Sequence, residues 1–192
     1  MRLLLLARHG QSLFNVDGVV NGDPALDRGL SPLGEDQARK LGAQIAHVAI
    51  DACVTSTFPR AEHTAELALG ARADGTPTSR DADLDDIRVG ALEGKTLDDY
   101  RAWKHEHTRA DPFPEGESLD DAARRYAAAF ARLLDRPEST ILCVCHEIPV
   151  RYAVNAAGGS DDLDGPLHDV ANATPYLFDE ASLRRAVERL RR

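Results

Sequence analysis

Short apolar runs recur along this chain, separated by stretches with helical periodicity, and this alternation limits the fold more than any other feature. Each run is too short for a helix and carries almost no charge, which is typical of strands buried on both faces of a sheet. Strands that alternate with helices form a layered α/β fold with a mainly parallel sheet. The predicted strands cover residues 3–7, 50–55, 140–145 and 174–178, the last with the weakest pattern.

The stretches between the strands carry the start and stop signals of helices. Ser31 is a typical N-cap residue, and Pro32 follows it at the first helical position. Ser118, with Asp121 three residues later, resembles a capping box. The predicted helices cover residues 32–47, 59–70, 118–134 and 182–190, with a strand as the alternative for the last segment.

Length and charge restrict what the chain does. Its 192 residues are enough for one domain with a sizeable core, and no linker or repeat divides them, so we predict a single domain over 1–192. The net charge of −9 repels polyanions, and no basic run offers a nucleic-acid footprint. No apolar stretch is long enough to span a membrane, and the first run is too short for a signal peptide. We therefore expect neither nucleic acid nor a membrane as a partner.

The cysteines are odd in number and lie within apolar runs. Two of them form a C-x-C pair, which lacks the spacing of a CxxC redox or metal motif. We interpret all three, Cys53, Cys143 and Cys145, as small core residues of a protein in the reducing cytoplasm.

Polar side chains follow the predicted strands at the points where the strands end. Arg8 and His9 end the first run, Ser56 and Arg60 follow the second, and His146 ends the third. The carboxyl ends of parallel strands meet at one edge of the sheet, where ligands gather in α/β folds. We therefore expect these side chains to lie close together.

Six motifs in order carry a resemblance to a known family. They are RHGQSLFN, LSPLGEDQA, TSTFPRAEHTAE, LDDIRVGALEG, FPEGESL and ILCVCHEIPVR. Over about residues 2–178 they resemble the histidine phosphatase superfamily, the phosphoglycerate mutase-like proteins. The resemblance implies a three-layer α/β/α sandwich and a phosphohistidine mechanism in which protein cations neutralise the phosphate, with no cofactor and no metal.

The resemblance also implies the catalytic roles. His9 matches the nucleophile, and a neutral imidazole nitrogen can attack phosphorus at ordinary pH. Arg8, Arg60 and His146 match the phosphate pocket, in which two guanidiniums and a second imidazole surround the phosphoryl oxygens. Ion pairing with the chain's many acids is the alternative role for the two arginines.

Three further residues match phosphate-binding positions of the family. Gly10 would let the backbone approach the phosphoryl group closely. Asn15 matches an asparagine that hydrogen-bonds a phosphate oxygen, with a turn residue as the alternative. Gly22 lies in a glycine region where the family can make a backbone contact to phosphate.

The proton donor departs from the family pattern. Family members commonly carry L-x-E four residues before a glycine, whereas this chain has Leu84-Asp85-Asp86 and Gly90. Asp86 therefore takes the place of the glutamate that protonates the leaving oxygen and later helps to activate water. Aspartate is one methylene shorter but can do the same acid–base chemistry. Asp85 and Glu93 are the alternative acids.

A second departure follows the second histidine. Glu147 stands where the family usually has glycine. A carboxylate there is expected to cap the following helix, whose N-terminus favours negative charge. Orientation of His146 is the alternative.

The segment of about 95–117 is a variable insert that in the family often forms a wall or lid near the active site. Trp103 within it is interpreted as a packing residue, with stacking on a substrate ring as the alternative. His105 and His107 do not share a helix face, and a pair alone does not make a metal site. We interpret them as polar surface residues.

The resemblance and the residues together predict a phosphatase that hydrolyses a small phosphorylated metabolite through phospho-His9. Two alternatives remain, a phosphoglycerate mutase-type phosphoryl transfer and a non-catalytic phospholigand-binding protein. Short length and Asp86 favour hydrolysis over transfer, because the mutases usually carry longer insertions and a glutamate as the acid.

Overall fold

A five-stranded sheet forms the centre of the computed structural model, which describes residues 1–192 apart from the side chain of residue 74. The strand order is β3-β2-β4-β1-β5. The first four strands in this order are parallel, and β5 runs antiparallel to β1. The strands are β1 (Leu3–Arg8), β2 (Ala52–Thr55), β3 (Thr78–Arg80), β4 (Thr140–Cys145) and β5 (Pro175–Asp179). The mainly parallel α/β fold predicted from the sequence is confirmed.

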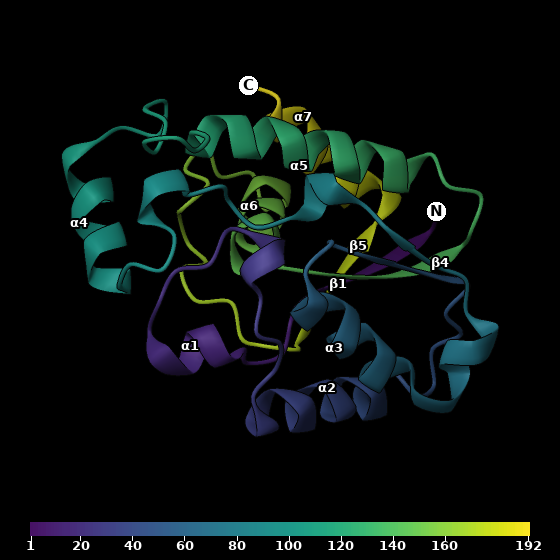
Figure 1. The fold of residues 1–192 in the computed structure, drawn as a ribbon. Helices are drawn as coiled ribbons and strands as arrows, with labels where there is room; N and C mark the ends of the chain where they lie inside the picture. The colour runs from purple at the N-terminus through teal and green to yellow at the C-terminus, as the bar shows by residue number, and fades with distance from the viewer.

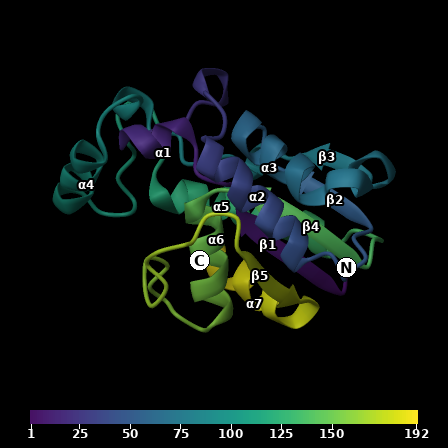
Figure 2. The ribbon, with the colours of Figure 1, turned by 90° about the horizontal axis from the view of Figure 1, so that it is seen from below.

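Helices cover both faces of the sheet. Figure 1 shows α2 and α3 below it and α5, α6 and α7 above it, and Figure 2, seen from below, shows α2 and α3 on the near side of the sheet. The helices are α1 (Leu13–Asp17), α2 (Pro32–Gln44), α3 (Pro59–Leu69), α4 (Leu97–Glu106), α5 (Leu119–Leu134), α6 (Glu147–Ala157) and α7 (Glu180–Leu190). Short 3-10 turns are η1 (Pro24–Leu26), η2 (Gly70–Gly75), η3 (Ala82–Leu84) and η4 (Gly90–Leu92). In the part of the chain that the structure describes, no helix is both long and apolar enough to cross a membrane.

The continuous apolar strands are explained by two buried clusters, one on each face. Along β4, Ile141, Cys143 and Cys145 belong to one cluster, while Leu142 and Val144 belong to the other. Successive side chains of a strand point to opposite faces, so a strand covered on both sides is apolar at every position.

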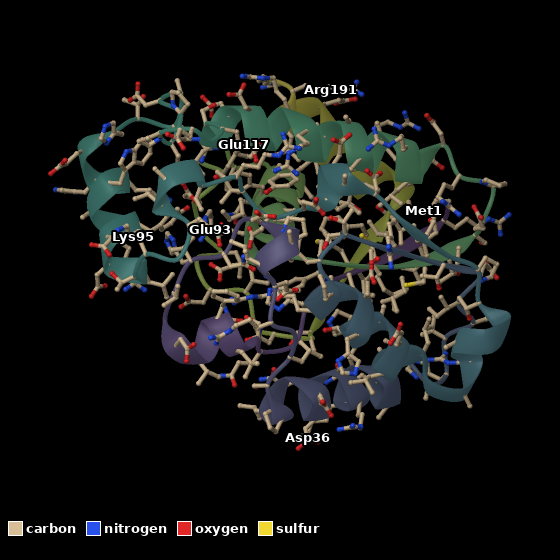
Figure 3. All side chains as sticks on the ribbon, viewed as in Figure 1. Met1, Asp36, Glu93, Lys95, Glu117 and Arg191 are labelled. Carbon is tan, nitrogen blue, oxygen red and sulfur yellow. The ribbon has the colours of Figure 1, made fainter. Side chains whose placement is uncertain are left out.

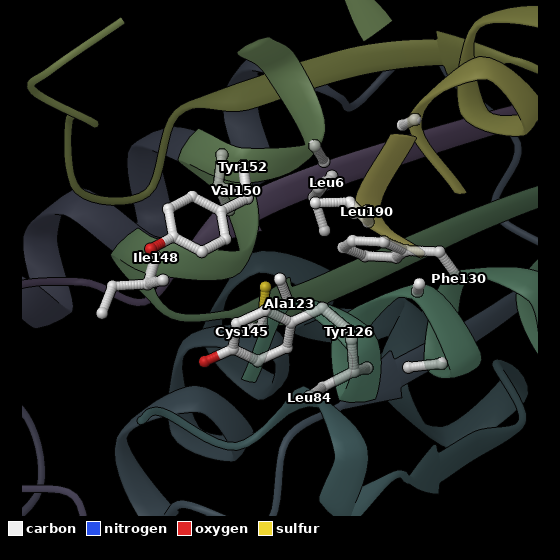
Figure 4. Close-up of a cluster of buried hydrophobic side chains, with 14 of the residues drawn as sticks. Leu6, Leu84, Ala123, Tyr126, Phe130, Cys145, Ile148, Val150, Tyr152 and Leu190 are labelled. Atoms are coloured by element: carbon white, nitrogen blue, oxygen red, sulfur yellow. The ribbon is translucent and has the colours of Figure 1, made fainter. Parts of the chain in front are cut away.

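The larger cluster lies between the sheet and α5, α6 and α7. Figure 4 shows the rings of Tyr126, Phe130 and Tyr152 packed near Leu6 of β1 and Cys145 of β4. The two tyrosines and Phe130 are fully buried. This packing fixes α6, which begins at the carboxyl end of β4, against the edge of the sheet where the polar residues lie.

Most predicted elements are present, with small differences at their ends. The capping box of α5 is confirmed, since the Asp121 N–H donates to Ser118 Oγ at 3.0 Å. The last segment is the helix α7 and not a strand. Two elements are not predicted from the sequence: β3, whose three residues are all exposed, and the largely polar α4. Neither segment carries the apolar pattern on which such predictions depend.

We expect the contact between α2 and α3 to be sensitive to one added methyl group. A Cβ on Gly42 of α2 would lie 2.5 Å from the backbone oxygen of Ala68 of α3. Gly42→Ala should lower the free energy of unfolding by about 1–3 kcal/mol, because backbone atoms cannot move aside as a flexible side chain can. Chemical denaturation of both proteins measures this. Gly75→Ala is the control, because a Cβ there meets no atom within 4 Å, and equal stability of the two variants would contradict the prediction.

Candidate active site

Three strands deliver polar residues to one edge of the sheet, as the sequence predicts. His9 follows β1, Ser56 follows β2, and His146 follows β4 as the N-cap residue of α6. Arg60 is the second residue of α3, which follows β2. The exposed fractions are only 2 % for His9, 3 % for Arg60 and 0 % for His146. In Figure 1, α1 and α4 lie beyond this edge.

The guanidinium of Arg60 joins the two imidazoles. Its Nε lies 3.1 Å from His9 Nε2, and its Nη2 lies 3.2 Å from His146 Nδ1. Arginine can only donate, so both ring nitrogens accept. The other nitrogen of each ring then carries the proton: His9 Nδ1 donates to the Gly10 oxygen at 2.6 Å, and His146 Nε2 donates to Ser56 Oγ at 2.8 Å. Both histidines are therefore held as neutral imidazoles with a defined tautomer.

Arg60 is itself fixed by two residues that the sequence analysis did not identify. The Arg60 N–H donates to Asp27 Oδ2 at 2.8 Å, and Nη1 lies 3.4 Å from Asp27 Oδ1. Nη1 also donates to the Asn21 side-chain oxygen, and Nη2 donates to the Asn21 backbone oxygen at 3.2 Å. The Asp27 side chain is fully buried. Both residues come from the loop between the first two motifs, where only the presence of polar residues hinted at a role.

Asp86 lies beside this cluster. Its Oδ2 is 3.4 Å from Arg60 Nη2 and 3.5 Å from His146 Nδ1. Its Oδ1 accepts from the Ile87 N–H at 3.0 Å. The carboxyl group is thus within reach of the two groups that would surround a phosphate.

The two alternative acids have other partners. Asp85 accepts from the Thr57 N–H at 2.7 Å and from the Thr57 hydroxyl at 2.8 Å. Glu93, labelled in Figure 3, accepts from the Asn21 side-chain amide at 2.8 Å and from the Gly22 N–H at 2.7 Å. Both carboxylates fasten loops, whereas Asp86 lines the cavity described below.

Burial shifts the proton affinities of this cluster in opposite directions. It lowers the pKa of His9 and of His146 well below the ordinary value, and the Arg60 charge lowers both further. It raises the pKa of Asp86, although the Arg60 charge opposes the rise. The cluster therefore favours neutral imidazoles beside a carboxyl group that retains its proton to a higher pH than usual.

The remaining predicted phosphate ligands differ in position. Asn15 lines the cavity, and its Oδ1 accepts from the Ser12 N–H in the capping box of α1. Gly10 donates its N–H to Thr64 Oγ1 at 3.0 Å, and a Cβ there would collide with the backbone oxygen of Gly34. Gly22 lines a smaller neighbouring hollow, where its N–H bonds Glu93. The structure thus gives Gly10 and Gly22 packing and loop contacts of their own.

Glu147 makes contacts that the sequence did not reveal. Its Oε2 lies 2.9 Å from Arg8 Nη1, and its Oε1 lies 3.3 Å from Arg151 Nη1. It is the first residue of α6, but the N-cap residue His146 has no side-chain cap bond. Glu147 does lie in the first turn of α6, where the helix N-terminus favours its charge as expected, and it also forms ion pairs with two arginines. The sequence does not reveal the pair of Glu147 with Arg8, because Arg8 ends β1, far away in the sequence, and the two residues meet only in the folded chain.

A cavity of about 510 Å³ opens onto the cluster. It is lined by Arg8, His9, Asn15, Arg60 and Asp86 at one end, and by residues of α4 at another side. The lining residues from α4 are Leu97, Tyr100, Arg101 and Lys104. The predicted insert of about 95–117 thus contributes a wall of the cavity.

Other residues of the insert pack on one another. The Trp103 ring lies 4.1 Å from the Phe113 ring and 4.1 Å from the His107 ring, centroid to centroid. Trp103 is a packing residue, as predicted. Within the described residues, no three His, Cys, Asp or Glu side chains are grouped closely enough to hold a metal ion.

Comparison with known proteins agrees with this geometry. Residues 4–191 match the histidine phosphatase superfamily (branch 1). The chain belongs to this superfamily. The resemblance of its six motifs is therefore confirmed over nearly the whole chain, and the fold class with it.

Relatives in the histidine phosphatase superfamily carry several activities. A 2,3-bisphosphoglycerate-dependent phosphoglycerate mutase from Methylorubrum extorquens is 33 % identical over 92 % of this chain and 89 % of its own. The α-ribazole phosphatase from Shigella flexneri is 26 % identical over 92 % and 95 % of the two chains, with a TM-score of 0.75. A mycobacterial glucosyl-3-phosphoglycerate phosphatase, solved with VO3, is 26 % identical over 92 % of each chain, with a TM-score of 0.74. Because the chain covers most of the mutase, its length does not separate hydrolysis from transfer.

The buried histidines of this histidine phosphatase superfamily member should make its stability depend on pH. Below about pH 6.5 the unfolded chain protonates both imidazoles, whereas the folded protein keeps them neutral because their pKa is lowered. Stability should therefore fall as pH falls from 6.5 towards the lowered pKa, by about 1 kcal/mol per histidine over the first pH unit. Denaturation between pH 7.5 and 5.5 measures this.

The matched variants are His9→Gln and His146→Gln, each of which removes one titrating ring. Each should reduce the loss of stability on acidification by about 1 kcal/mol. His47→Gln, which removes an exposed histidine, is the control. An unchanged loss in both site variants would contradict neutral burial of the two rings.

Proposed function

We propose that this chain is a metal-independent phosphomonoester hydrolase that acts through a phosphohistidine at His9 on a small phosphorylated metabolite. One observation supports this above the others. A buried Arg60 holds two neutral imidazoles, with the Asp86 carboxyl 3.4 Å from its Nη2. This set contains a nucleophile, a cationic clamp and an acid around one point at the end of the cavity.

In the first step, Arg60 Nε shifts its hydrogen bond from His9 Nε2 to a phosphoryl oxygen, the freed Nε2 lone pair attacks phosphorus, and the bond from phosphorus to the leaving oxygen breaks. Asp86 gives its proton to that oxygen. Arg8 and Arg60 stabilise the charge on the phosphoryl oxygens, His146 holds the Arg60 guanidinium in place, and Asn15 can donate a further hydrogen bond. Protein cations supply the charge neutralisation that a metal provides in other phosphatases, so the reaction needs no metal.

In the second step, water attacks the phosphohistidine and gives a proton to the Asp86 carboxylate. The N–P bond breaks, inorganic phosphate forms, and His9 and Asp86 return to their starting protonation states. The opposed pKa shifts of His9 and Asp86 support this cycle, because the base must be free and the acid must be loaded at the same pH.

Phosphoglycerate mutase activity is the second candidate, and the mutase relative at 33 % identity favours it. The two reactions share the phosphoenzyme and differ in the acceptor, which is water in one and a sugar acid in the other. Labelled phosphoenzyme should pass its label to water in the presence of 3-phosphoglycerate, and a screen of phosphorylated metabolites should find the substrate. Transfer of the label to 3-phosphoglycerate would instead identify a mutase.

We also propose a cytoplasmic protein of one domain, residues 1–192, with the insert of about 95–117 near the active site. The three cysteines are free and buried, as expected in a reducing compartment. One sheet carries both apolar clusters.

His9 is expected to be essential for the phosphoenzyme. His9→Ala should abolish both turnover of p-nitrophenyl phosphate and the acid-labile phosphoprotein. His146→Ala should slow phosphorylation severely but leave the nucleophile in place, so labelled protein still forms slowly. Rapid quench with labelled substrate measures both, and a chelator should not change the result. A phosphoenzyme that persists in His9→Ala, or activity that needs an added divalent ion, would contradict the mechanism; a non-catalytic binding protein would give no phosphoenzyme at all.

Asp86 is expected to act as the acid for poor leaving groups. Asp86→Asn should lower the rate of single-turnover phosphorylation about 10²–10⁴-fold with an alkyl phosphate, and much less with p-nitrophenyl phosphate, whose phenolate leaves without a proton. Glu93→Gln and Asp85→Asn are the matched controls, since both carboxylates fasten loops. Equal losses on the two substrates, or a larger difference in Glu93→Gln, would place the acid elsewhere.

A further inference from the structure

Glu147 places a negative charge inside a cavity proposed to bind phosphate. Its Oε2 lies 2.9 Å from Arg8 Nη1, and both residues line the cavity. The side chains remain partly accessible, with exposed fractions of 17 % for Arg8 and 33 % for Glu147. An incoming phosphoryl group would therefore meet an arginine that already has an anionic partner.

Arg8 has capacity for another acceptor. Nη1 also donates to the backbone oxygen of Val170 at 2.8 Å, which holds the side chain in place. Among the described residues, the buried Nε of Arg8 has no hydrogen-bond partner. Such a buried donor is unusual in a folded protein. The bond to Val170 and the ion pair with Glu147 both use Nη1, so Nη2 is the guanidinium nitrogen that can donate to an anion in the cavity.

Glu147 also has a second cationic partner. Arg151, one turn further along α6, lies 3.3 Å from Glu147 Oε1 through its Nη1. The other end of the Arg151 guanidinium, Nη2, pairs with Asp164 Oδ1 at 2.8 Å. The Glu147 carboxylate thus lies between two guanidiniums, and it can give up its ion pair with Arg8 while it keeps the one with Arg151.

We propose that Glu147 competes with phosphate for Arg8: it occupies Arg8 in the unliganded protein, yields it to a phosphoryl group, and then pairs with Arg151 alone. This inference rests on the proposed function, because it takes Arg8 as a phosphate ligand. A clamp of two arginines and two histidines would bind inorganic phosphate, the product, tightly. A carboxylate beside the bound dianion repels it, and so weakens product binding and speeds release.

Glu147 acts on the acid as well. Its charge contributes to the raised pKa of Asp86. The same carboxylate therefore weakens phosphate binding and helps Asp86 to keep its proton. Glu147 is a positioning residue in this scheme, since it acts through Arg8 and Asp86.

Binding of inorganic phosphate to the full chain, measured by calorimetry at neutral pH, tests the competition. Glu147→Gln keeps the shape of the side chain and removes its charge, and should lower the Kd about tenfold, the scale of a partly buried charge interaction. Glu66→Gln neutralises an exposed acid on α3 and should leave the Kd unchanged. An unchanged or higher Kd in Glu147→Gln would overturn the proposal.

Substitution of Arg151 gives a second test, in which the Kd for phosphate should change in the opposite direction. Arg151→Gln removes the alternative partner, so Glu147 should hold Arg8 more firmly and the Kd should rise several-fold. In the Glu147→Gln background the same substitution should have no effect. An equal rise in both backgrounds would make Arg151 a direct phosphate ligand and overturn the exchange.

Two controls keep the experiment decisive. Thermal melts establish that each variant is folded, and Glu147→Ser, which suits the first turn of a helix, replaces Glu147→Gln if that variant is unstable. Calorimetry needs no turnover, so the inference and the proposed function fail separately. A wild-type protein without a phosphoenzyme would refute the function, whereas an unresponsive Kd would refute only the role of Glu147.

Discussion

The buried guanidinium of Arg60 is the contact on which the rest of the site depends. A charge removed from water is costly unless it is paired and hydrogen-bonded. Asp27 supplies the opposite charge and Asn21 supplies two oxygen acceptors. The remaining N–H groups point at His9, His146 and Asp86. Because its supports come from the protein, Arg60 is already oriented before any substrate binds, which is what electrostatic catalysis requires.

The same burial decides where the protons are. Removal from water disfavours the charged form of each titratable group in the cluster, so it lowers the pKa of both imidazoles and raises the pKa of Asp86. The Arg60 charge lowers the pKa of both histidines, as burial does, and it opposes the rise that burial causes in the pKa of Asp86. The two shifts bring the pKa values of the base and the acid towards each other, which is the arrangement that the proposed proton and phosphoryl transfer needs.

Much of this arrangement could be predicted from the sequence, and the contacts that could not be predicted join residues that are far apart in the chain. Strands such as β4 were predictable because burial on both faces requires an apolar residue at every position. Arg8, His9, Arg60 and His146 were expected to lie close together because they stand at or just after the ends of those strands, and the family resemblance singled them out as the candidate site. The hydrogen bond of Arg60 with Asn21 and the ion pair of Arg8 with Glu147 could not be predicted, because these residues are distant in sequence and meet only in the folded chain. The α4 helix was missed because its composition is polar.

The two ends of the cavity differ in how firmly they are built. The end at which we propose that phosphate binds is set by residues that follow β1, β2 and β4, strands that are packed between two apolar clusters. The opposite wall comes from α4, a helix with no fully buried residue, held by contacts such as Tyr100 on Phe113. Changes in such a wall cost little stability and leave the chemistry intact. If the proposed function holds, the end of the cavity at Arg60 carries the reaction and the α4 wall contacts the leaving group, so that a change in the wall would change the substrate without changing the fold.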